Sequence, residues 1–249
     1  MQNHNAIEVE NLTCGYGEHI ILKKISFSVP ARELMFIVGA SGCGKSTLLR
    51  TMIGLLAPQG GRISYFGKNF IRADEEHRHA ILKTFGVLYQ NNALWSSMSV
   101  GENLSLALEQ YTALNRQDRE EVVALKLAQV GLSGVEDLYP RELSGGMKKR
   151  VALARALALD PRIVFFDEPS EGLDPLMSRE IDELIMEVRE TLGTTIVIVS
   201  HQLSSIFRIA DRIVMLDPES QGIIADGAPR RLAKESTDAR VRDFLTQDH

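Results

Sequence analysis

The chain has 249 residues, 44% hydrophobic and 24% charged, so it can bury a core as one large domain or two small ones. Its 28 basic and 33 acidic residues give a net charge of −5, which argues against a nucleic-acid binder that grips many phosphates and against a polybasic lipid anchor. Cys14 and Cys43 are too few for a disulfide framework and are typical of reduced thiols in a cytosolic protein. Residues 1–5 lack the features of a signal peptide, and no stretch approaches the roughly 18 apolar residues of a membrane span.

The first part of the chain is predicted to be mainly strands. Apolar residues recur at period two within 7–38, and the run Leu34–Val38 is continuously apolar, as in a parallel strand buried on both faces. A glycine-rich loop follows, and then a helix from about Lys45 to Leu56. Further strands are predicted at 62–70 and Phe85–Tyr89.

The pattern then changes to helices without intervening strands. Apolar residues at helical spacing predict helices at Asn103–Tyr111, Arg116–Val130 and Gly145–Leu159. We therefore expect a mostly helical subdomain at 91–160, inserted into an α/β core.

Strands and helices alternate again in the last third of the chain. Strands are predicted at Ile163–Phe166, Thr195–Val199 and Ile213–Leu216, with a helix near Gln202–Ala210. Asp174 and Pro175 are the preferred residues at the start of a further helix. This alternation predicts an α/β fold with a parallel sheet covered by helices. The segment 228–249 is predicted to be a polar, helical tail.

A phosphate-binding loop is predicted between the strand at 34–38 and the next helix. Residues 39–47 fit G-x-x-x-x-G-K-[ST] in the strand–loop–helix context that this pattern needs, and a chance match would be about a 1% event. Glycines let backbone N–H groups turn toward a phosphate, and the helix N-terminus adds about half a positive charge. Lys45 can reach the β- and γ-phosphates, and the Ser46 hydroxyl can bind Mg²⁺. The candidate contacts are Gly39, Ser41, Gly42, Cys43 through its backbone N–H, Gly44, Lys45, Ser46 and Thr47.

Two carboxylates follow the apolar strand at 163–166. Asp167, at the strand tip beside the phosphate loop, suits a contact to Mg²⁺, usually through water. Glu168 faces differently and suits the general base that aligns an attacking water. The alternative is a pair of solvated loop acids.

A second anion-binding design lies in the helical region. Ser144, Gly145, Gly146 and Met147 place a hydroxyl and two glycines at a helix N-terminus. Two phosphate sites in one chain are best explained if each nucleotide contacts the first site of one chain and the second site of another. The alternative is an ordinary serine N-cap followed by glycines.

Together these motifs resemble those of the ATP-binding-cassette (ABC) family, in that family's order along nearly the whole chain. The Walker A loop corresponds to 39–47, the signature to 143–147, and the end of the Walker B strand to Asp167 and Glu168. The resemblance implies a single ABC ATPase domain over 1–249 that uses ATP and Mg²⁺. Its parts would be a RecA-like P-loop NTPase core at 1–90 and 161–227, a helical signature subdomain at 91–160 and a tail at 228–249.

The resemblance also gives roles to residues that carry little signal alone. Gln90 stands at the Q-loop position, His201 at the switch histidine, Asp174 at the end of the D-loop and Tyr16 where an aromatic ring stacks on adenine. Alone, Tyr16 would be half-buried packing, Gln90 a surface residue and His201 a capped core histidine. The implied catalytic residues are Lys45, Glu168 and His201, and the implied Mg²⁺ contacts are Ser46, Gln90 and Asp167.

Some basic and aromatic residues have ordinary explanations. The run 148–150 and Arg155 are expected to form a solvated helix face or salt bridges between subdomains. Trp95 is expected either to line a groove for a partner or to be a packed aromatic residue.

Several departures and local stretches resemble one branch of the family. Met147 replaces the glutamine of most cassettes, and Glu171 stands in the D-loop where a small residue is common. Met147 with the residues after it, the stretch 86–97 and the tail segment 238–245 resemble cassettes of Mla or MCE-type lipid transporters. This resemblance implies phospholipid transport between bacterial membranes, which maintains the lipid asymmetry of the outer membrane. It also implies a homodimer, peripheral on the cytoplasmic face of the inner membrane, with an integral-membrane permease, an MCE-domain protein and a small regulatory subunit as partners, and no nucleic acid.

Three other functions remain open from the residues. The chain could serve a transporter of another solute, because an ATPase subunit does not touch the cargo. A soluble cassette of DNA repair or translation usually has a coiled-coil insert or a tandem second cassette, which we do not find. A nucleotide-binding regulator without turnover would not need Glu168 and His201.

Overall fold

The structure is a computed structural model that describes residues 5–246. Residues 1–4, which belong to the stretch inspected for a signal peptide, and residues 247–249 of the predicted tail lie outside it. No helix within the described range is long and apolar enough to cross a membrane.

An antiparallel sheet forms from the first part of the chain. It contains β1 (Asn5–Tyr16), β2 (His19–Pro30), β4 (Gly60–Tyr65) and β5 (Lys68–Asn69) in the order β2-β1-β4-β5. The prediction of one strand at 62–70 was wrong. The backbone turns sharply at Phe66 and Gly67, which both have positive φ angles, and so the segment forms two short paired strands.

The second sheet has six strands and carries the phosphate loop. Its order is β10-β9-β3-β8-β7-β6, with parallel pairing except between β9 and β10. The parallel sheet predicted from the alternating pattern is thus confirmed, whereas the hairpin strand β10 was not predicted. The strands are β3 (Leu34–Val38), β6 (Phe85–Leu88), β7 (Ile163–Asp167), β8 (Thr195–Val199), β9 (Arg212–Asp217) and β10 (Gly222–Gly227).

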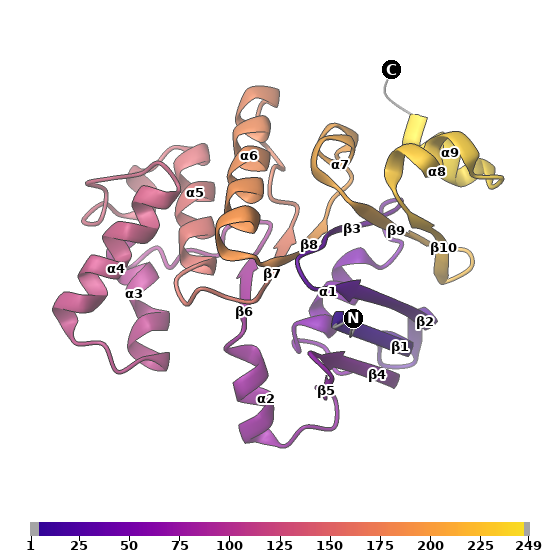
Figure 1. Cartoon of the computed structure of the whole chain (residues 1–249), viewed down its shortest axis with the longest axis horizontal. Coiled ribbons are helices and arrows are strands. Elements are labelled where there is room, and N and C mark those ends of the chain that lie inside the picture. The colour runs from indigo at the N-terminus through magenta and orange to yellow at the C-terminus, as the bar shows by residue number, and fades with distance from the viewer. Residues whose placement is uncertain (1–4, 247–249) are drawn as a thin grey trace.

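Strand β3 is buried on both faces, as its continuous apolar run predicted. Leu34, Phe36 and Val38 pack into a core under the helices, and Met35 and Ile37 pack into a second core. The second core also receives the apolar side chains of α1 (Lys45–Met52), which lies between the two sheets (Figure 1). The start of α1, and with it the phosphate loop, is therefore held between two packed layers.

Residues 100–156 contain the three helices predicted for the helical subdomain. They are α3 (Val100–Tyr111), α4 (Arg116–Gln129) and α5 (Gly145–Ala156), with a short 3₁₀ turn at Pro140–Glu142. In Figure 1 they lie beside α6 and beyond strand β6. Helix α3 begins three residues earlier than predicted, because Ser99 and Glu102 form a reciprocal capping box. The exact limits of the subdomain, 91 and 160, stay a prediction.

Other helix ends differ from the predictions for local reasons. Helix α1 stops at Met52 rather than at Leu56, since Gly54 has a positive φ angle that ends the helix. Helix α5 stops at Ala156 rather than at Leu159. Helix α2 (Glu75–Leu82) was not predicted, although Asp74 caps it. The remaining helices are α6 (Pro175–Leu192), α7 (Leu203–Ile209), α8 (Pro229–Glu235) and α9 (Ala239–Thr246).

Candidate active site

The loop between β3 and α1 has the backbone conformation of a phosphate cradle. Gly39, Gly42 and Gly44 have φ angles of 141°, 79° and 103°, which L side chains rarely adopt. A Cβ atom on Gly44 would lie 2.8 Å from the side chain of Ile21, so no larger residue fits there. The Nζ atom of Lys45 donates hydrogen bonds to the Gly39 carbonyl at 2.8 Å and the Ala40 carbonyl at 3.0 Å. The ammonium is thereby held directly above the loop.

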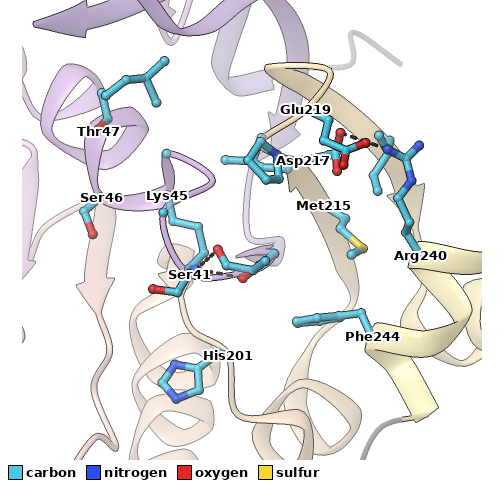
Figure 2. Close-up of a pocket in the computed structure, with 18 of the residues that line it drawn as sticks. Ser41, Lys45, Ser46, Thr47, His201, Met215, Asp217, Glu219, Arg240 and Phe244 are labelled. Atoms are coloured by element: carbon cyan, nitrogen blue, oxygen red, sulfur yellow. Dashed lines mark hydrogen bonds and ion pairs between the residues drawn. The ribbon is translucent and has the colours of Figure 1, made fainter.

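A cavity of about 1070 Å³ opens over this loop. One wall consists of the loop itself, and Gln90, Glu168 and His201 come from the ends of the neighbouring strands β6, β7 and β8. Such a position, outside the carboxyl ends of parallel strands, is where α/β proteins bind ligands. Figure 2 shows Lys45 and His201 on one side of the cavity and Arg240 and Phe244 on the other.

Glu168 and His201 form a hydrogen-bonded pair at this cavity. The Nδ1 atom of His201 lies 2.8 Å from Oε1 of Glu168, while the other carboxylate oxygen, Oε2, is buried without a partner among the described residues. Glu168 is only 8% exposed, and its φ angle of 49° is left-handed. A buried carboxylate with one oxygen oriented by histidine and one left over is arranged to accept a further hydrogen bond.

Asp167 lies one residue earlier, with its Oδ1 atom buried and unpaired within residues 5–246. Burial raises the pKa of this carboxyl, and the negative charge of Glu168 raises it further. A positive charge placed near Asp167 would therefore be strongly favoured.

The Q-loop and the D-loop are connected across the same site. The side-chain amide of Gln90 donates to Oε2 of Glu171 at 2.6 Å, and Glu171 also lines the cavity. Lys149, only 4% exposed, reaches from α5 and donates to the carbonyls of Gln90 at 2.9 Å and Glu168 at 3.3 Å. The prediction that Lys149 belongs to a solvated or salt-bridged helix face was wrong, because backbone carbonyls bind its charge.

Comparison with known proteins identifies the family. The family model described as "ABC transporter" matches residues 22–171. This chain belongs to the ABC transporter family. The chain is 38% identical to the "Intermembrane phospholipid transport system ATP-binding protein MlaF" of Haemophilus influenzae over 98% of this chain and 91% of that protein. It is 38% identical to the "Probable ribonucleotide transport ATP-binding protein mkl" of Mycobacterium tuberculosis over 96% of this chain, which spans 66% of that relative.

A solved structure gives the same result for the fold. The chain matches the "Dimeric structure of a post-hydrolysis state of the ATP-binding cassette MJ0796 bound to ADP and Pi" with a TM-score of 0.80 and 28% identity. The match covers 89% of this chain and 98% of that one. The prediction of an ABC ATPase fold, which was made from the order of the motifs along the chain, is confirmed.

Some of the residues predicted for this ABC cassette lie outside the cavity lining. Tyr16 is 46% exposed, and its hydroxyl accepts a hydrogen bond from Arg50 at 3.1 Å. Cys43 is buried, burial raises the pKa of its thiol, and its N–H donates to the Ala40 carbonyl within the loop. Asp174 caps α6 through the N–H groups of Leu176 and Met177.

The signature residues 143–147 do not line the cavity above the phosphate loop of their own chain. Ser144 caps α5 by accepting from the N–H of Met147, as the N-cap alternative predicted. Gly146 is buried, and a Cβ atom there would lie 1.8 Å from Met177. Gly145, by contrast, is exposed and has open space around it. Ser144 and Gly145 of the signature are therefore at the surface, where a second molecule can reach them.

Two other basic residues of α5 contact neighbouring elements. Arg150 forms an ion pair with Glu180 of α6 at 2.6 Å, which confirms the predicted salt bridge. Arg155 donates to the carbonyls of Asn92 and Ala93, so neither of its two predicted environments was correct.

The sequence reasoning missed the wall formed by the tail. Arg240 and Phe244 of α9 line the cavity, and Arg240 forms an ion pair with Asp217, at the end of β9, at 3.0 Å (Figure 2). The apolar face of the tail helix indicated that this helix packs against another part of the chain. No local sequence pattern indicated which part.

Proposed function

We propose that this chain is the ATP-hydrolysing subunit of a transporter that moves phospholipid between bacterial membranes. The observation that carries the proposal is the 38% identity over 91% of a phospholipid-transport cassette, combined with the Glu168–His201 pair above the phosphate loop. The loop glycines and Lys45 bind the phosphates of ATP. Glu168 is the general base for the attacking water, and His201 orients the carboxylate of Glu168.

Several other predicted residues complete the nucleotide site. Ser41, Gly42 and Thr47 bind phosphate oxygens alongside Lys45, as parts of the same loop. Tyr16 stacks on adenine, because its ring is exposed and its face is free to contact a base.

The chain's polar groups fit a Mg²⁺ ion near the phosphates. Residues 5–246 hold no cluster of three His, Cys, Asp or Glu side chains that could bind a metal on their own. Mg²⁺ in such sites takes one or two protein oxygens and completes its shell with phosphates and water. The unpaired Oδ1 of Asp167 and the hydroxyl of Ser46 are suitable oxygens, and the amide oxygen of Gln90 is a third. The ion would neutralise negative charge on the phosphates during transfer.

Each nucleotide is shared between two copies of the chain. The signature residues Ser144, Gly145, Gly146 and Met147 do not line their own chain's cavity, and the related cassette MJ0796 forms a dimer. A second copy that presents its signature over the phosphate loop gives the helix N-terminus an anion to bind. Asp174 accepts a hydrogen bond from the N–H of Met177, whose side chain packs against Gly146 of the signature. Asp174 therefore belongs to the same interface.

A groove of about 550 Å³ on the helical region suits the permease. Trp95, Leu106 and Tyr111 line it and are exposed, which favours the first of the two environments expected for Trp95, a groove for a partner. Large exposed apolar side chains around a hollow mark a protein-binding surface. The assembled complex would hold this chain on the cytoplasmic face of the inner membrane, with an MCE-domain protein and a small regulatory subunit as further partners.

Reconstitution tests the cargo. The wild-type chain is co-expressed with a candidate permease and a candidate MCE-domain protein from the same organism. ATP-dependent transfer of labelled phospholipid between the MCE-domain protein and a bilayer should occur, and should be lost with Glu168→Gln. The relative named for ribonucleotide transport makes another solute the second candidate. ATPase activity stimulated by a ribonucleotide, with no lipid bound or moved by the complex, would overturn the lipid assignment.

A further inference from the structure

A buried lysine links three functional segments of the chain. Lys149 lies on α5, the helix whose first residues are the signature, yet its ammonium contacts the Q-loop and the Walker B end. Burying an ammonium group is costly unless its hydrogen bonds are replaced. Here the carbonyls of Gln90 and Glu168 accept two of them. Burial lowers the pKa of Lys149, and the nearby carboxylates Glu171, Glu168 and Asp167 oppose that shift.

The contact with Glu168 acts on a strained backbone. A non-glycine residue at a φ angle of 49° is strained and persists only where its surroundings hold it. The N–H of Glu168 donates to the Val199 carbonyl at 2.9 Å, and its own carbonyl accepts from Lys149. The peptide groups on both sides of Glu168 are thus fixed, which sets the direction of its side chain toward His201.

The contact with Gln90 fixes the second loop in the same way. Lys149 binds the carbonyl of Gln90, and the amide of that residue extends to Glu171 at the cavity. One ammonium group therefore sets the distance between the backbones that carry the base and the Q-loop glutamine.

We propose that Lys149 is a positioning residue for ATP hydrolysis, which holds Glu168 and Gln90 of its own chain in register over the nucleotide. The proposal rests on the ATPase function proposed above. A purely structural lysine would instead anchor α5, and its loss would disturb the signature at the start of that helix.

The first test separates turnover from binding in the purified full-length chain. Lys149→Met removes the charge and keeps the length of the side chain, and we expect kcat to fall on the order of tenfold, because a misplaced base slows chemistry. The affinity for a fluorescent ATP analogue should stay within about twofold, since no phosphate contact is lost. Lys149→Gln, whose amide can donate to two carbonyls, should regain part of the activity.

The matched control is Lys148→Met, the neighbouring lysine, which is only partly buried and should keep the wild-type kcat. A kcat for Lys149→Met equal to that of this control, per folded molecule, would overturn the proposal. So would a loss of nucleotide affinity without a loss of kcat. If Lys149→Met does not fold, the same comparison is made between Lys149→Leu, which likewise has no donor for the two carbonyls, and Lys148→Leu. A wild-type chain without any ATPase activity would instead refute the proposed function.

The second test uses mixed dimers with a single working site. One chain carries Ser144→Arg and supplies the phosphate loop, and the other carries Lys45→Ala and supplies the signature. Lys149→Met in the first chain should lower kcat, because Glu168 and Gln90 of that chain serve the working site. The same substitution in the second chain should lower kcat far less. Equal losses in the two arrangements, or a larger loss in the second, would show that Lys149 only supports the signature helix.

Discussion

Glu168 combines a buried carboxylate, a histidine partner and an unpaired oxygen at the nucleotide cavity. Glu168→Gln keeps the shape and the hydrogen bond but removes the basicity. We expect ATP to bind normally, kcat to fall by about 100-fold or more, and a closed dimer to accumulate in ATP, as size-exclusion chromatography would detect. Lys45→Ala should instead weaken ATP binding itself, because a positive charge next to the phosphates is lost, and a fluorescence titration would measure this. Near-normal turnover by Glu168→Gln would rule out this residue as the base.

The sequence predicted those residues whose chemistry requires a particular side chain at a fixed spacing. Lys45 and Glu168 are of this kind, since each belongs to a short motif beside an apolar strand. Lys149 and Arg240 are not. The contacts that bring them to the cavity are with two backbone carbonyls and the carboxylate of Asp217, which are distant in the sequence. Nothing local distinguishes such a lysine from a solvated one.

Helices α6 and α7 are joined by an ion pair between a buried carboxylate and a half-exposed arginine. Asp182 of α6 is 1% exposed and pairs with Arg208 of α7 at 2.8 Å, and burial raises the pKa of Asp182. Arg208→Ala leaves that carboxyl buried without an ion-pair partner, so the free energy of unfolding should fall by about 2–3 kcal/mol. Urea denaturation would measure the loss.

Arg179→Ala on the same helix is the matched control for this prediction. Its pair with Glu183 is exposed on both sides, and so the unfolding free energy should change by no more than about 0.5 kcal/mol. Equal effects of Arg179→Ala and Arg208→Ala would mean that burial does not strengthen the pair. The end of α1 was less predictable than the helix itself, because a single glycine just beyond it decides where the helix stops.

The whole molecule presents its two anion-binding motifs on different surfaces. If each nucleotide uses Lys45 of one chain and Ser144 of another, a mixture of Lys45→Ala and Ser144→Arg chains contains dimers with one intact site. The mixture should recover part of the ATPase activity that each variant lacks alone. Confirmed mixed dimers with no activity would indicate either a site complete within one chain or two sites that must act together.

The α/β class and the helical insert could be predicted because they follow from local patterns of apolar residues. The strand order β10-β9-β3-β8-β7-β6 could not, since it depends on which faces pack together after distant segments meet. The position of α9 in the wall of the cavity could not be predicted either, for the same reason. Helix α9 lies beside β9 through contacts such as the ion pair of Arg240 with Asp217, and only folding brings these two segments together.

Within residues 5–246, strand β3 pairs only with β8 and β9, and this has a consequence for synthesis on the ribosome. The phosphate loop is translated about 150 residues before Thr195, so at ordinary elongation rates it waits on the order of ten seconds for either neighbour. During that time the apolar edges of β3 are open, and the antiparallel sheet formed within residues 5–69 is the structure available to shelter them. A nascent chain therefore carries its complete ATP motif well before it can hold ATP, and chaperones that shield hydrophobic segments have β3 as their natural target.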